Sequence, residues 1–389
     1  MPTKLLCVGF SVRATAASAS RAGFHPLAVD YFADTDLQAI AAVQQVAGYP
    51  TDVVRAAADL PAASFLYTGA LENHPEIVQQ LQRQRTLLGN DAATTRRVRD
   101  PFQLAGVLRA AGYPLPEITR DVDQVPTDGS WLSKNARGSG GSHVRRWYGG
   151  THTFGDHGYF QKRAEGIPCS GVFLAAGGRA MLLGTTRQLI GAAWTSAAGF
   201  TYAGSIGPLA LQPSDRTAWN QIGSAVASQF HLSGLFGVDA VLQNESLWPL
   251  EVNPRYTASV EVLERACGWH SIRLHVDACR EARLPAALDD CPPNPLCCGK
   301  AILYARRDIT IGPCFGQLAD RKNREQAWPC VADIPRIDTA IRCGRPICTV
   351  LTDGVDLAAV EDRLKSLAAE VESAVYGNRQ GVGSGVFSL

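Results

Sequence analysis

The sequence predicts an α/β protein built from several packed units, and three observations support this class. The chain opens with an apolar run (residues 4–10), an alanine-rich stretch (11–23) and a second apolar run (26–30). Two short apolar runs joined by a helix are typical of parallel strands in α/β folds. Short apolar runs divided by glycine fill residues 131–250, and a helical pattern occupies 357–376.

The size and composition are those of a soluble globular protein. The chain has 389 residues, of which 46% are hydrophobic and 19% are charged. This length exceeds one ordinary core, so two or three packed subdomains are expected. The formal net charge is +1, which predicts no field that would attract nucleic acid or an anionic membrane. The sequence contains no apolar run as long as a bilayer span.

The N-terminus and the cysteines favour a cytoplasmic location. The first apolar run is short, and Arg13 and Arg21 interrupt the stretch that follows it. We therefore interpret it as the first strand and helix of a domain and not as an export signal. The eleven cysteines include no CxxC pair, which favours free thiols in a reducing cytoplasm over a metal cluster.

The loops after the first two strands carry no dinucleotide motif. The first loop lacks GxGxxG, so a dinucleotide site has little support. The second loop is acidic and contains Asp30, Asp34 and Asp36. We favour a solvated turn for this loop, and contact with a substrate amine is the alternative.

Further elements follow along the chain. The segment 289–295 is rich in proline and looks like a connector, and residues 377–389 are rich in glycine and serine, which predicts a mobile tail. Strands are expected at 63–67, 300–304 and 346–351, and helices at 75–84 and 101–111.

A lysine precedes a glycine-rich run within residues 131–142. Glycine lets the backbone approach a ligand closely, and successive amide N–H groups can surround phosphate oxygens. The lysine adds a point charge for the same phosphates. A flexible hairpin tip explains the segment equally well. The residues concerned are Lys134, Gly138, Ser139, Gly140 and Gly141.

A second segment, residues 159–166, places polar and charged residues at the end of an apolar run. Taken alone it predicts an edge strand and a turn. It contains Gln161, Lys162 and Ala164.

The strongest chemical pattern is a predicted β-hairpin over residues 236–255. Asp239 and Glu251 can come level across the two strands, and Asn253 lies on the same face as Glu251. Hard oxygen ligands of this kind suit Mg²⁺. Arg255 follows and can bind a carboxylate or a phosphoryl group. A solvated hairpin face with incidental acids is the alternative.

In this order, the three segments resemble the ATP-grasp superfamily. The twelve-residue step from Asp239 to Glu251 is similar to that of biotin carboxylase. Residues 251–259 resemble the predicted ATP-dependent carboligases of this superfamily, a group similar to the tyramine–glutamate ligases of methanofuran synthesis. Residues 332–335 and 344–350 resemble the C-terminal region of carboxylase-type members. The resemblance spans most of the chain.

The resemblance implies three domains and a role for each motif. A pre-ATP-grasp α/β domain is expected at 1–95, an ATP-grasp domain at 96–295 and a small mixed domain at 296–389. The glycine-rich run would close over the phosphates of ATP. Lys134 and Lys162 would contact the nucleotide, Gln161 and Ala164 would face adenine, and Arg255 would steady an acyl phosphate. Asp239, Glu251 and Asn253 would hold Mg²⁺, with Mn²⁺ as the alternative.

One position departs from the family pattern. Relatives such as biotin carboxylase have a lysine after an aspartate where this chain has Asp100-Pro101. Proline cannot bind a phosphate, so Arg97 or Arg99 is expected to replace the lysine. A solvated charge at a helix end is the alternative for Arg97.

The activity implied by the resemblance is that of an ATP-dependent carboxylate–amine ligase. It would form an amide through an acyl phosphate and release ADP, and its role would be in the biosynthesis of a one-carbon-carrier cofactor. The substrates would be a small carboxylate, with L-glutamate as a candidate, and an amine, and the assembly would be a homodimer. The alternatives are a carboxylase or phosphotransferase of the same fold, and a nucleotide-binding protein without catalysis.

Overall fold

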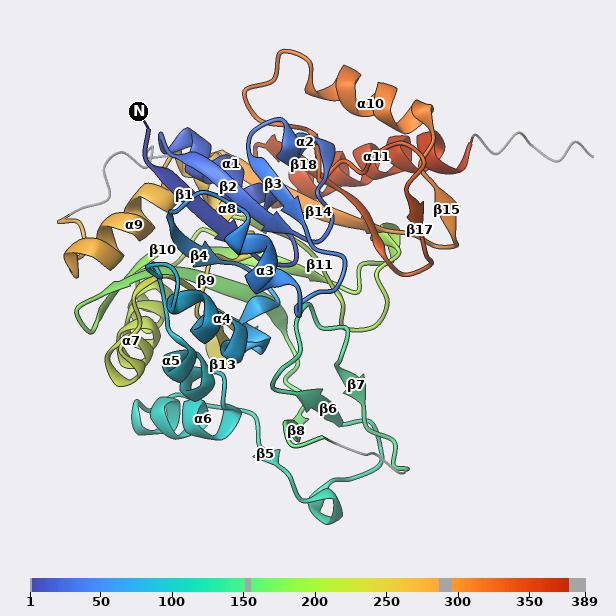
Figure 1. The fold of residues 1–389 in the computed structure, drawn as a ribbon. Helices are drawn as coiled ribbons and strands as arrows, with labels where there is room; N and C mark the ends of the chain where they lie inside the picture. Colours follow the sequence, from blue (N-terminus) through green and yellow to red (C-terminus); the bar gives the residue numbers. More distant parts are fainter. Residues whose placement is uncertain (1, 151–154, 287–295, 378–389) are drawn as a thin grey trace, which may run out of the picture.

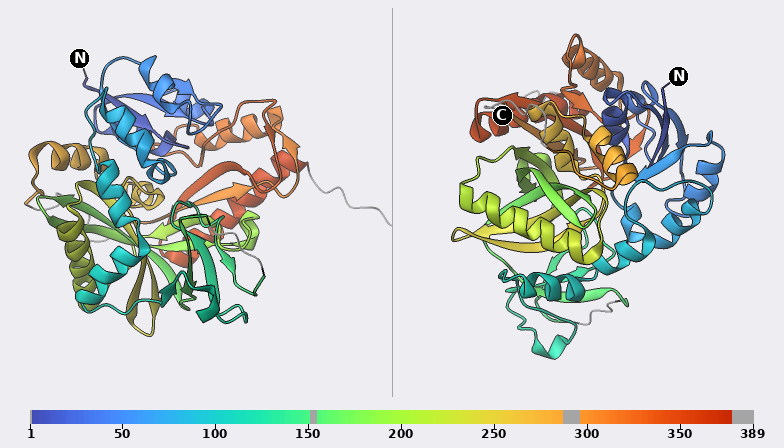
Figure 2. Two further views of the ribbon diagram at one scale, coloured as in Figure 1. Left: turned by 60° about the horizontal axis from the view of Figure 1, so that its bottom comes forward. Right: turned by 90° about the vertical axis from the view of Figure 1, so that its left-hand side faces the viewer.

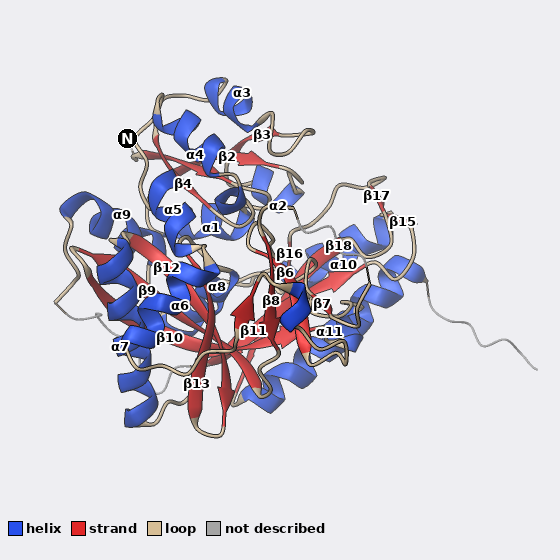
Figure 3. Cartoon of the chain, turned by 90° about the horizontal axis from the view of Figure 1, so that it is seen from below, coloured by secondary structure: helices blue, strands red, loops and turns tan. Residues whose placement is uncertain are grey.

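The structure is a computed structural model that describes residues 2–150, 155–286 and 296–377. Its architecture is a mixture of helices and sheets, so the predicted α/β class is confirmed (Figure 1). Strands gather in the middle and helices surround them when the chain is seen from below (Figure 3). The predicted connector at 289–295 and most of the predicted mobile tail lie outside the described residues.

The N-terminal sheet has the parallel arrangement that the sequence predicts. Its order is β3-β2-β1-β4, and β1 pairs in parallel with both β2 and β4. The chain therefore reverses its direction of sheet growth between β1 and β4, where their carboxyl ends form a switch point. The elements are β1 (Lys4–Val8), α1 (Arg13–Arg21), β2 (His25–Asp30), α2 (Thr35–Gln38), β3 (Ala42–Gln45), α3 (Val53–Ala58), β4 (Ser64–Tyr67), η1 (Leu71–Asn73) and α4 (Pro75–Gln82).

Two helices then lead to a small antiparallel sheet that projects from the rest of the chain (Figures 1 and 2). The helix α6 begins at Pro101, and the Asp100 side chain accepts hydrogen bonds from the backbone of Phe102 and Gln103, which caps its first turn. The elements are α5 (Ala92–Val98), α6 (Pro101–Ala110), β5 (Ile118–Thr119), η2 (Val122–Gln124), β6 (Trp131–Asn135), β7 (Arg145–Arg146) and β8 (Gly158–Lys162).

An eight-stranded sheet forms the centre of the molecule in the order β13-β12-β9-β10-β11-β14-β18-β16. It continues from the middle of the chain into the tail because β14 pairs with β11. The proposed boundary near residue 295 therefore divides one continuous sheet, and it remains a proposal. The strands are β9 (Ile167–Ala176), β10 (Arg179–Ile190), β11 (Tyr202–Gly207), β12 (Gly234–Gln243), β13 (Ser246–Asn253), β14 (Cys297–Tyr304), β16 (Val331–Ala332) and β18 (Pro346–Gly354).

Helices cover both faces of this sheet. Phe173 and Ala175 of β9 pack in the core under α7, whereas Val172 and Leu174 pack in the core with α8 and α9. Alternate residues of a strand point to opposite faces, so α7 and the α8–α9 pair lie on opposite sides. The remaining elements are η3 (Ala193–Thr195), α7 (Pro213–Phe230), α8 (Ala258–Cys267), α9 (Ser271–Glu281), β15 (Ile309–Thr310), α10 (Pro313–Asn323), β17 (Ala340–Ile341) and α11 (Leu357–Tyr376).

The predicted pattern of short strands over 131–250 is partly wrong. It omits the 18-residue helix α7. It also underestimates β9 and β10, which have 10 and 12 residues. The helical spacing of Trp219, Ile222, Val226 and Phe230 could have revealed α7, since these side chains form its buried face. The predicted strands at 63–67, 300–304 and 346–351 and the predicted helices at 75–84, 101–111 and 357–376 are confirmed.

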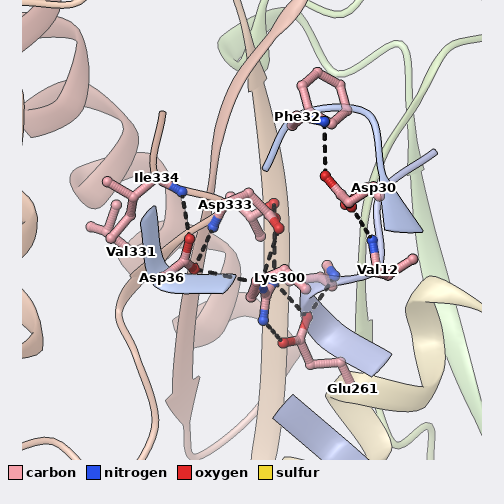
Figure 4. A network of polar contacts seen from close by, with 12 residues as sticks. Val12, Asp30, Phe32, Asp36, Glu261, Lys300, Val331, Asp333 and Ile334 are labelled. Carbon is pink, nitrogen blue, oxygen red and sulfur yellow. Dashed lines mark hydrogen bonds and ion pairs between the residues drawn. The ribbon is translucent and has the colours of Figure 1, made fainter. Parts of the chain in front are cut away.

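A buried ionic network joins the N-terminal sheet to α8 and to the tail (Figure 4). Arg13 of α1 forms ion pairs with Glu261 of α8 and with Asp333, whose Oδ1 lies 2.9 Å from Arg13 Nε. Lys300 Nζ of β14 lies 2.7 Å from Glu261 Oε2. Because Arg13, Glu261 and Lys300 are buried, removing one of their charges would leave a partner uncompensated. The network therefore fixes three parts of the chain against one another.

The acidic loop after β2 belongs to this network, so the prediction of a solvated turn is wrong. Asp30 and Asp34 are buried, and Asp36 accepts hydrogen bonds from the backbone N–H groups of Asp333 and Ile334. Burial, and next the charge of Asp333, raises the pKa of Asp34 to about 8. Burial raises the pKa of Asp30 to about 6.

Ten cysteines lie in the described ranges. Most of them are buried among apolar side chains, as Cys7 and Cys348 are. Cys291 lies outside the described residues. Among the helices that the structure describes, none combines the length and the hydropathy of a bilayer span.

We expect Asp34→Asn to stabilise the fold more at pH 8 than at pH 5. The folded protein holds the Asp34 proton up to a pH of about 8, whereas an unfolded chain releases it at about 4. The native carboxyl therefore lowers the free energy of unfolding as the pH rises through this window, and asparagine does not. The gain should be about 1–3 kcal/mol larger at pH 8 in urea unfolding.

The exposed acid Asp59 offers a matched control, Asp59→Asn, for general charge effects. An equal effect of Asp34→Asn at both pH values would contradict the buried, protonated carboxyl.

Candidate active site

A cavity of about 360 Å³ lies between the small sheet and the central sheet. This is the size of an ordinary small-molecule site. Its walls come from β6, β8 and their glycine-rich loop on one side and from β10, β12 and β13 on the other. The predicted site residues that line it are Lys134, Ser139, Gly140, Gly141, Gln161, Ala164, Asp239, Glu251, Asn253 and Arg255.

Two carboxylates and an amide meet at one end of the β12–β13 hairpin. Asp239 and Glu251 are direct partners across the two antiparallel strands. Asn253 Nδ2 donates to Asp239 Oδ2 at 2.9 Å, and Gln188 Nε2 of β10 donates to Asp239 Oδ1 at 2.9 Å. The hairpin register that the sequence predicts therefore brings three oxygen-bearing side chains together. Gln188 was not predicted, because its strand is distant in sequence.

The protonation of Asp239 and Glu251 indicates that this pair of acids requires a nearby cation. Burial, and next the charge of Glu251, raises the pKa of Asp239 to about 7. Burial alone would raise the pKa of Glu251, but Lys134 and Arg99 hold it below its usual value. Two carboxylates this close repel each other unless a cation lies between or beside them. Their hard oxygen atoms fit a magnesium ion bridged to phosphates.

Lys134 reaches this site from β6. It is 8% exposed, and its Nζ donates to Gln161 Oε1 of β8 at 3.1 Å. Its ammonium also lies 5.8 Å from the centre of the Tyr159 ring. Burial alone would lower the pKa of Lys134, but the neighbouring Tyr159 and Glu251 outweigh this effect and raise it, so the lysine is positively charged. A buried cation beside two acids is suited to binding phosphate oxygens.

The glycine-rich loop is docked on the segment before β11. Gly140 O accepts a hydrogen bond from the backbone N–H of Tyr202 at 2.9 Å. Gly141 has φ of +72°, and a Cβ atom there would lie 1.9 Å from the carbonyl oxygen of Phe200. Only glycine allows this approach. The loop therefore forms a lid over the cavity, held by backbone contacts.

Arg99, one of the two arginines expected to replace the missing lysine, contacts the acid hairpin and the lid. Its Nη1 donates to Asn253 Oδ1 at 3.3 Å, and its Nη2 donates to the carbonyl groups of Ala136 and Gly138 at 2.9 and 2.8 Å. Arg97 instead donates to the carbonyl group of Phe230 at 3.0 Å, on the far side of α5. Of the two arginines, the structure thus brings Arg99 to the site.

Arg255 is held by a residue that the sequence did not suggest. Its Nη2 donates to Glu72 Oε1 of η1 at 2.6 Å and to Asn253 Oδ1 at 3.2 Å. Ser139 Oγ of the lid donates to the same Glu72 oxygen at 3.2 Å. Glu72 lies in a short loop after β4 with no motif around it, so only the tertiary structure reveals its place.

The sequence comparison now identifies the domain that holds these groups. Residues 98–259 match the family model described as the ATP-grasp domain. The chain contains an ATP-grasp domain. This match begins just before Arg99 and ends after Arg255, so it includes the lid, the lysine and the acid hairpin. A comparison with curated proteins finds no match.

Solved structures share the ATP-grasp fold over nearly the whole chain. The biotin carboxylase domain of Hydrogenobacter thermophilus 2-oxoglutarate carboxylase has a TM-score of 0.70 at 15% identity, over 94% of this chain and 89% of that one. The L-amino acid ligase of Bacillus licheniformis has a TM-score of 0.68 at 15% identity, over 95% and 98%. The N5-carboxyaminoimidazole ribonucleotide synthetase of Thermotoga maritima has a TM-score of 0.64 at 15% identity, over 95% of this chain and 98% of that one. The predicted fold is confirmed.

Two predicted contacts of the ATP-grasp domain need correction. Lys162 does not line the cavity, because it points to the opposite face of β8 from Gln161 and pairs with the exposed Glu117 at 2.6 Å. Strand alternation makes this outcome inevitable once Gln161 faces the cavity. Gly138 lies in the lid but packs against His143 and does not line the cavity.

The far end of the cavity is lined by hydroxyl groups. Tyr202 Oη lies 2.8 Å from Ser205 Oγ, which lies 3.1 Å from Ser259 Oγ of α8. Thr257 is the N-cap residue of α8, and its Oγ1 is buried without a hydrogen-bond partner in the described part of the chain. The N-terminus of this helix adds partial positive charge near Arg255. This end of the ATP-grasp domain is suited to an anionic group.

We expect Gly141→Ala to release the lid, because the added methyl group collides with the Phe200 carbonyl. Limited trypsin cleavage at the exposed Arg137 and Arg145 should then become faster by about ten-fold. Gly140→Ala is the matched control, since Gly140 also has a positive φ but a Cβ there meets nothing within 4 Å. Equal cleavage of the two variants would show that the lid does not depend on this close contact.

Proposed function

We propose that the chain is an ATP-dependent ligase that joins a carboxylate to an amine and releases ADP. The supporting observation is the convergence of a glycine lid, a buried lysine, an acid hairpin and an arginine on one cavity. The solved neighbours include a carboxylase domain in complex with MgADP and bicarbonate, an L-amino acid ligase and a ribonucleotide synthetase. A carboxylate or related acid and ATP are thus fitting substrates for this chain as well.

Three groups of side chains in the cavity would have separate roles. Gln161 and Ala164 would face the adenine, and Lys134 with the lid would bind the phosphates. Asp239, Glu251 and Asn253 would hold Mg²⁺, which neutralises phosphate charge during transfer. The raised pKa of Asp239 fits this role, because a bound cation would offset the charge of Glu251, which raises this pKa together with burial.

Arg255 would guide the chemistry at the far end of the cavity. A carboxylate is a poor electrophile, so one of its oxygens first takes the γ-phosphoryl group of ATP, and ADP leaves. An amine nitrogen then attacks the acyl carbon, the C–N bond forms, and inorganic phosphate departs with the electron pair of the broken C–O bond, while the nitrogen loses a proton to the departing phosphate. Lys134, Arg99 and Arg255 would offset the negative charge in both steps without a covalent enzyme intermediate.

The finer expectations remain proposals from the family resemblance. L-Glutamate as one substrate, a role in one-carbon-carrier cofactor biosynthesis and a homodimeric assembly belong to this group. The cytoplasm as the location does too. The direct test of the proposed activity is a screen for Mg²⁺-dependent ADP release from ATP with L-amino acids and bicarbonate as acids, each with and without amines. Release that needs both an acid and an amine supports the ligase, and release with bicarbonate alone would favour a carboxylase.

We expect Lys134→Ala to lower ATP turnover by about 10²-fold or more, because it removes a buried charge beside the transferred phosphoryl group. The measurement is the rate of ADP release at saturating ATP and Mg²⁺. Lys162→Ala is the matched control, since this lysine is exposed and pairs with Glu117 on the surface. A surface pair contributes about 0–1 kcal/mol, so this variant should stay within a few-fold of the native rate. The opposite ranking would place the nucleotide on the other face of β8.

A further inference from the structure

Glu72 stands at the meeting point of the N-terminal sheet, the lid and Arg255. Its Oε1 accepts hydrogen bonds from Arg255 Nη2 at 2.6 Å and from Ser139 Oγ at 3.2 Å. The side chain is 0% exposed. Burial alone would raise the pKa of Glu72, but Arg255 holds it below its usual value, so the group is a carboxylate. One oxygen of this anion is therefore fully engaged.

The other carboxylate oxygen of Glu72 has no hydrogen-bond donor among the described residues. Glu72 Oε2 is buried and accepts no hydrogen bond from any residue that the structure describes. An ionised oxygen without a donor in a buried place is costly, and proteins rarely leave one bare. Ordinary packing would pair this oxygen or expose it to water. The position calls for a donor that the described residues do not supply.

Two more polar atoms near Glu72 are also buried without a hydrogen-bond partner among the described residues. Tyr49 Oη and Arg255 Nε are buried and lack hydrogen-bond partners within the described ranges. Burial, and next the charge of Glu72, raises the pKa of Tyr49, so its hydroxyl keeps its proton. The three atoms have complementary chemistry, because Arg255 Nε can only donate and Glu72 Oε2 can only accept. An anionic reactant could accept a hydrogen bond from Arg255 Nε, and a cationic reactant could donate one to Glu72 Oε2.

The location suits a substrate. Glu72 and Tyr49 belong to the loops at the carboxyl ends of the N-terminal strands, near the β1–β4 switch point. Open parallel sheets bind ligands in the crevice at such a point. Arg255, on the other side of Glu72, lines the cavity beside the acid hairpin. A group bound by Glu72 would thus face whatever Arg255 holds.

Aromatic rings surround the Tyr49 side of this place. The Phe10 ring lies 5.2 Å from the Tyr49 ring and stacks on Tyr31 at 4.6 Å. The His74 ring lies 6.2 Å from Tyr49 on another side. Aromatic faces attract cations and apolar groups, and the nearby acids repel anions. The environment therefore favours a positively charged group on an apolar or aromatic body.

From these contacts we infer that Glu72 Oε2 and Tyr49 Oη bind the ammonium group of the amine substrate, a primary amine with an apolar or aromatic body. In this arrangement Arg255 holds the acyl phosphate, and Glu72 holds the amine substrate beside it. This inference rests on the proposed ligase activity for its biological meaning. The binding site itself can be tested without any turnover.

The test is calorimetric binding of benzylammonium chloride to the whole chain with MgADP present, compared with the neutral isostere benzyl alcohol. The native protein should bind benzylammonium at least ten-fold more tightly. Glu72→Gln keeps the shape and removes the charge, so it should abolish this preference. Tyr49→Phe removes only the unpaired hydroxyl and should weaken benzylammonium binding about three-fold, and it carries the test if Glu72→Gln fails to fold.

Two variants serve as controls. Glu76→Gln removes an acid of the same segment that is 46% exposed, and it should leave the preference intact. Ser139→Ala removes the lid contact of Glu72 while keeping its pair with Arg255, so it separates lid effects from amine binding. A native protein without preference for the cation, or an unchanged preference in Glu72→Gln, overturns the inference. Absence of ADP release with every acid and amine would instead overturn the proposed function alone.

Discussion

The alignment of Asp239 with Glu251 across one β-hairpin is the constraint on which the site depends. Two carboxylates held level on neighbouring strands and away from water cannot both remain charged without cations nearby. The cations nearby are Lys134 of the small sheet and Arg99 at the end of α5. They come from different parts of the chain, so the small sheet, the lid and the end of α5 are all arranged around the hairpin.

The segment after the N-terminal sheet supplies a side chain, Glu72, to the group of residues around the hairpin. Glu72 pairs with Arg255 and accepts a hydrogen bond from the lid. On its other side the same sheet is tied to α8 through Arg13 and Glu261. Because α8 begins directly after Arg255, two ionic contacts fix the arginine from both ends of its segment. A shift of the N-terminal sheet would therefore move the arginine relative to the acids.

The errors of sequence-based prediction have specific physical causes. Lys162 and Gln161 are adjacent, and only the pairing of β8 with β6 decides which of them faces the cavity. Asp30, Asp34 and Asp36 look like a solvated loop because acids usually are exposed, but Asp30 and Asp34 are buried, and the backbone N–H groups of Asp333 and Ile334 donate to Asp36. Helix α7 is rich in serine, threonine and glutamine, so its buried stripe is narrow and easily overlooked. Glu72 has no motif, and its partners lie far away in sequence.

The sequence by itself determined the class of the fold, the positions of several strands and helices, and the identity and spacing of the acid hairpin. These features depend on local geometry, since a strand alternates its faces and a two-strand turn fixes register within a few residues. The tertiary structure alone decided that Arg99 and not Arg97 reaches Asn253, that Lys162 points away from the cavity, and that Glu72 pairs with Arg255. Those contacts connect residues tens to hundreds of positions apart, and only packing of whole domains brings them within hydrogen-bonding distance.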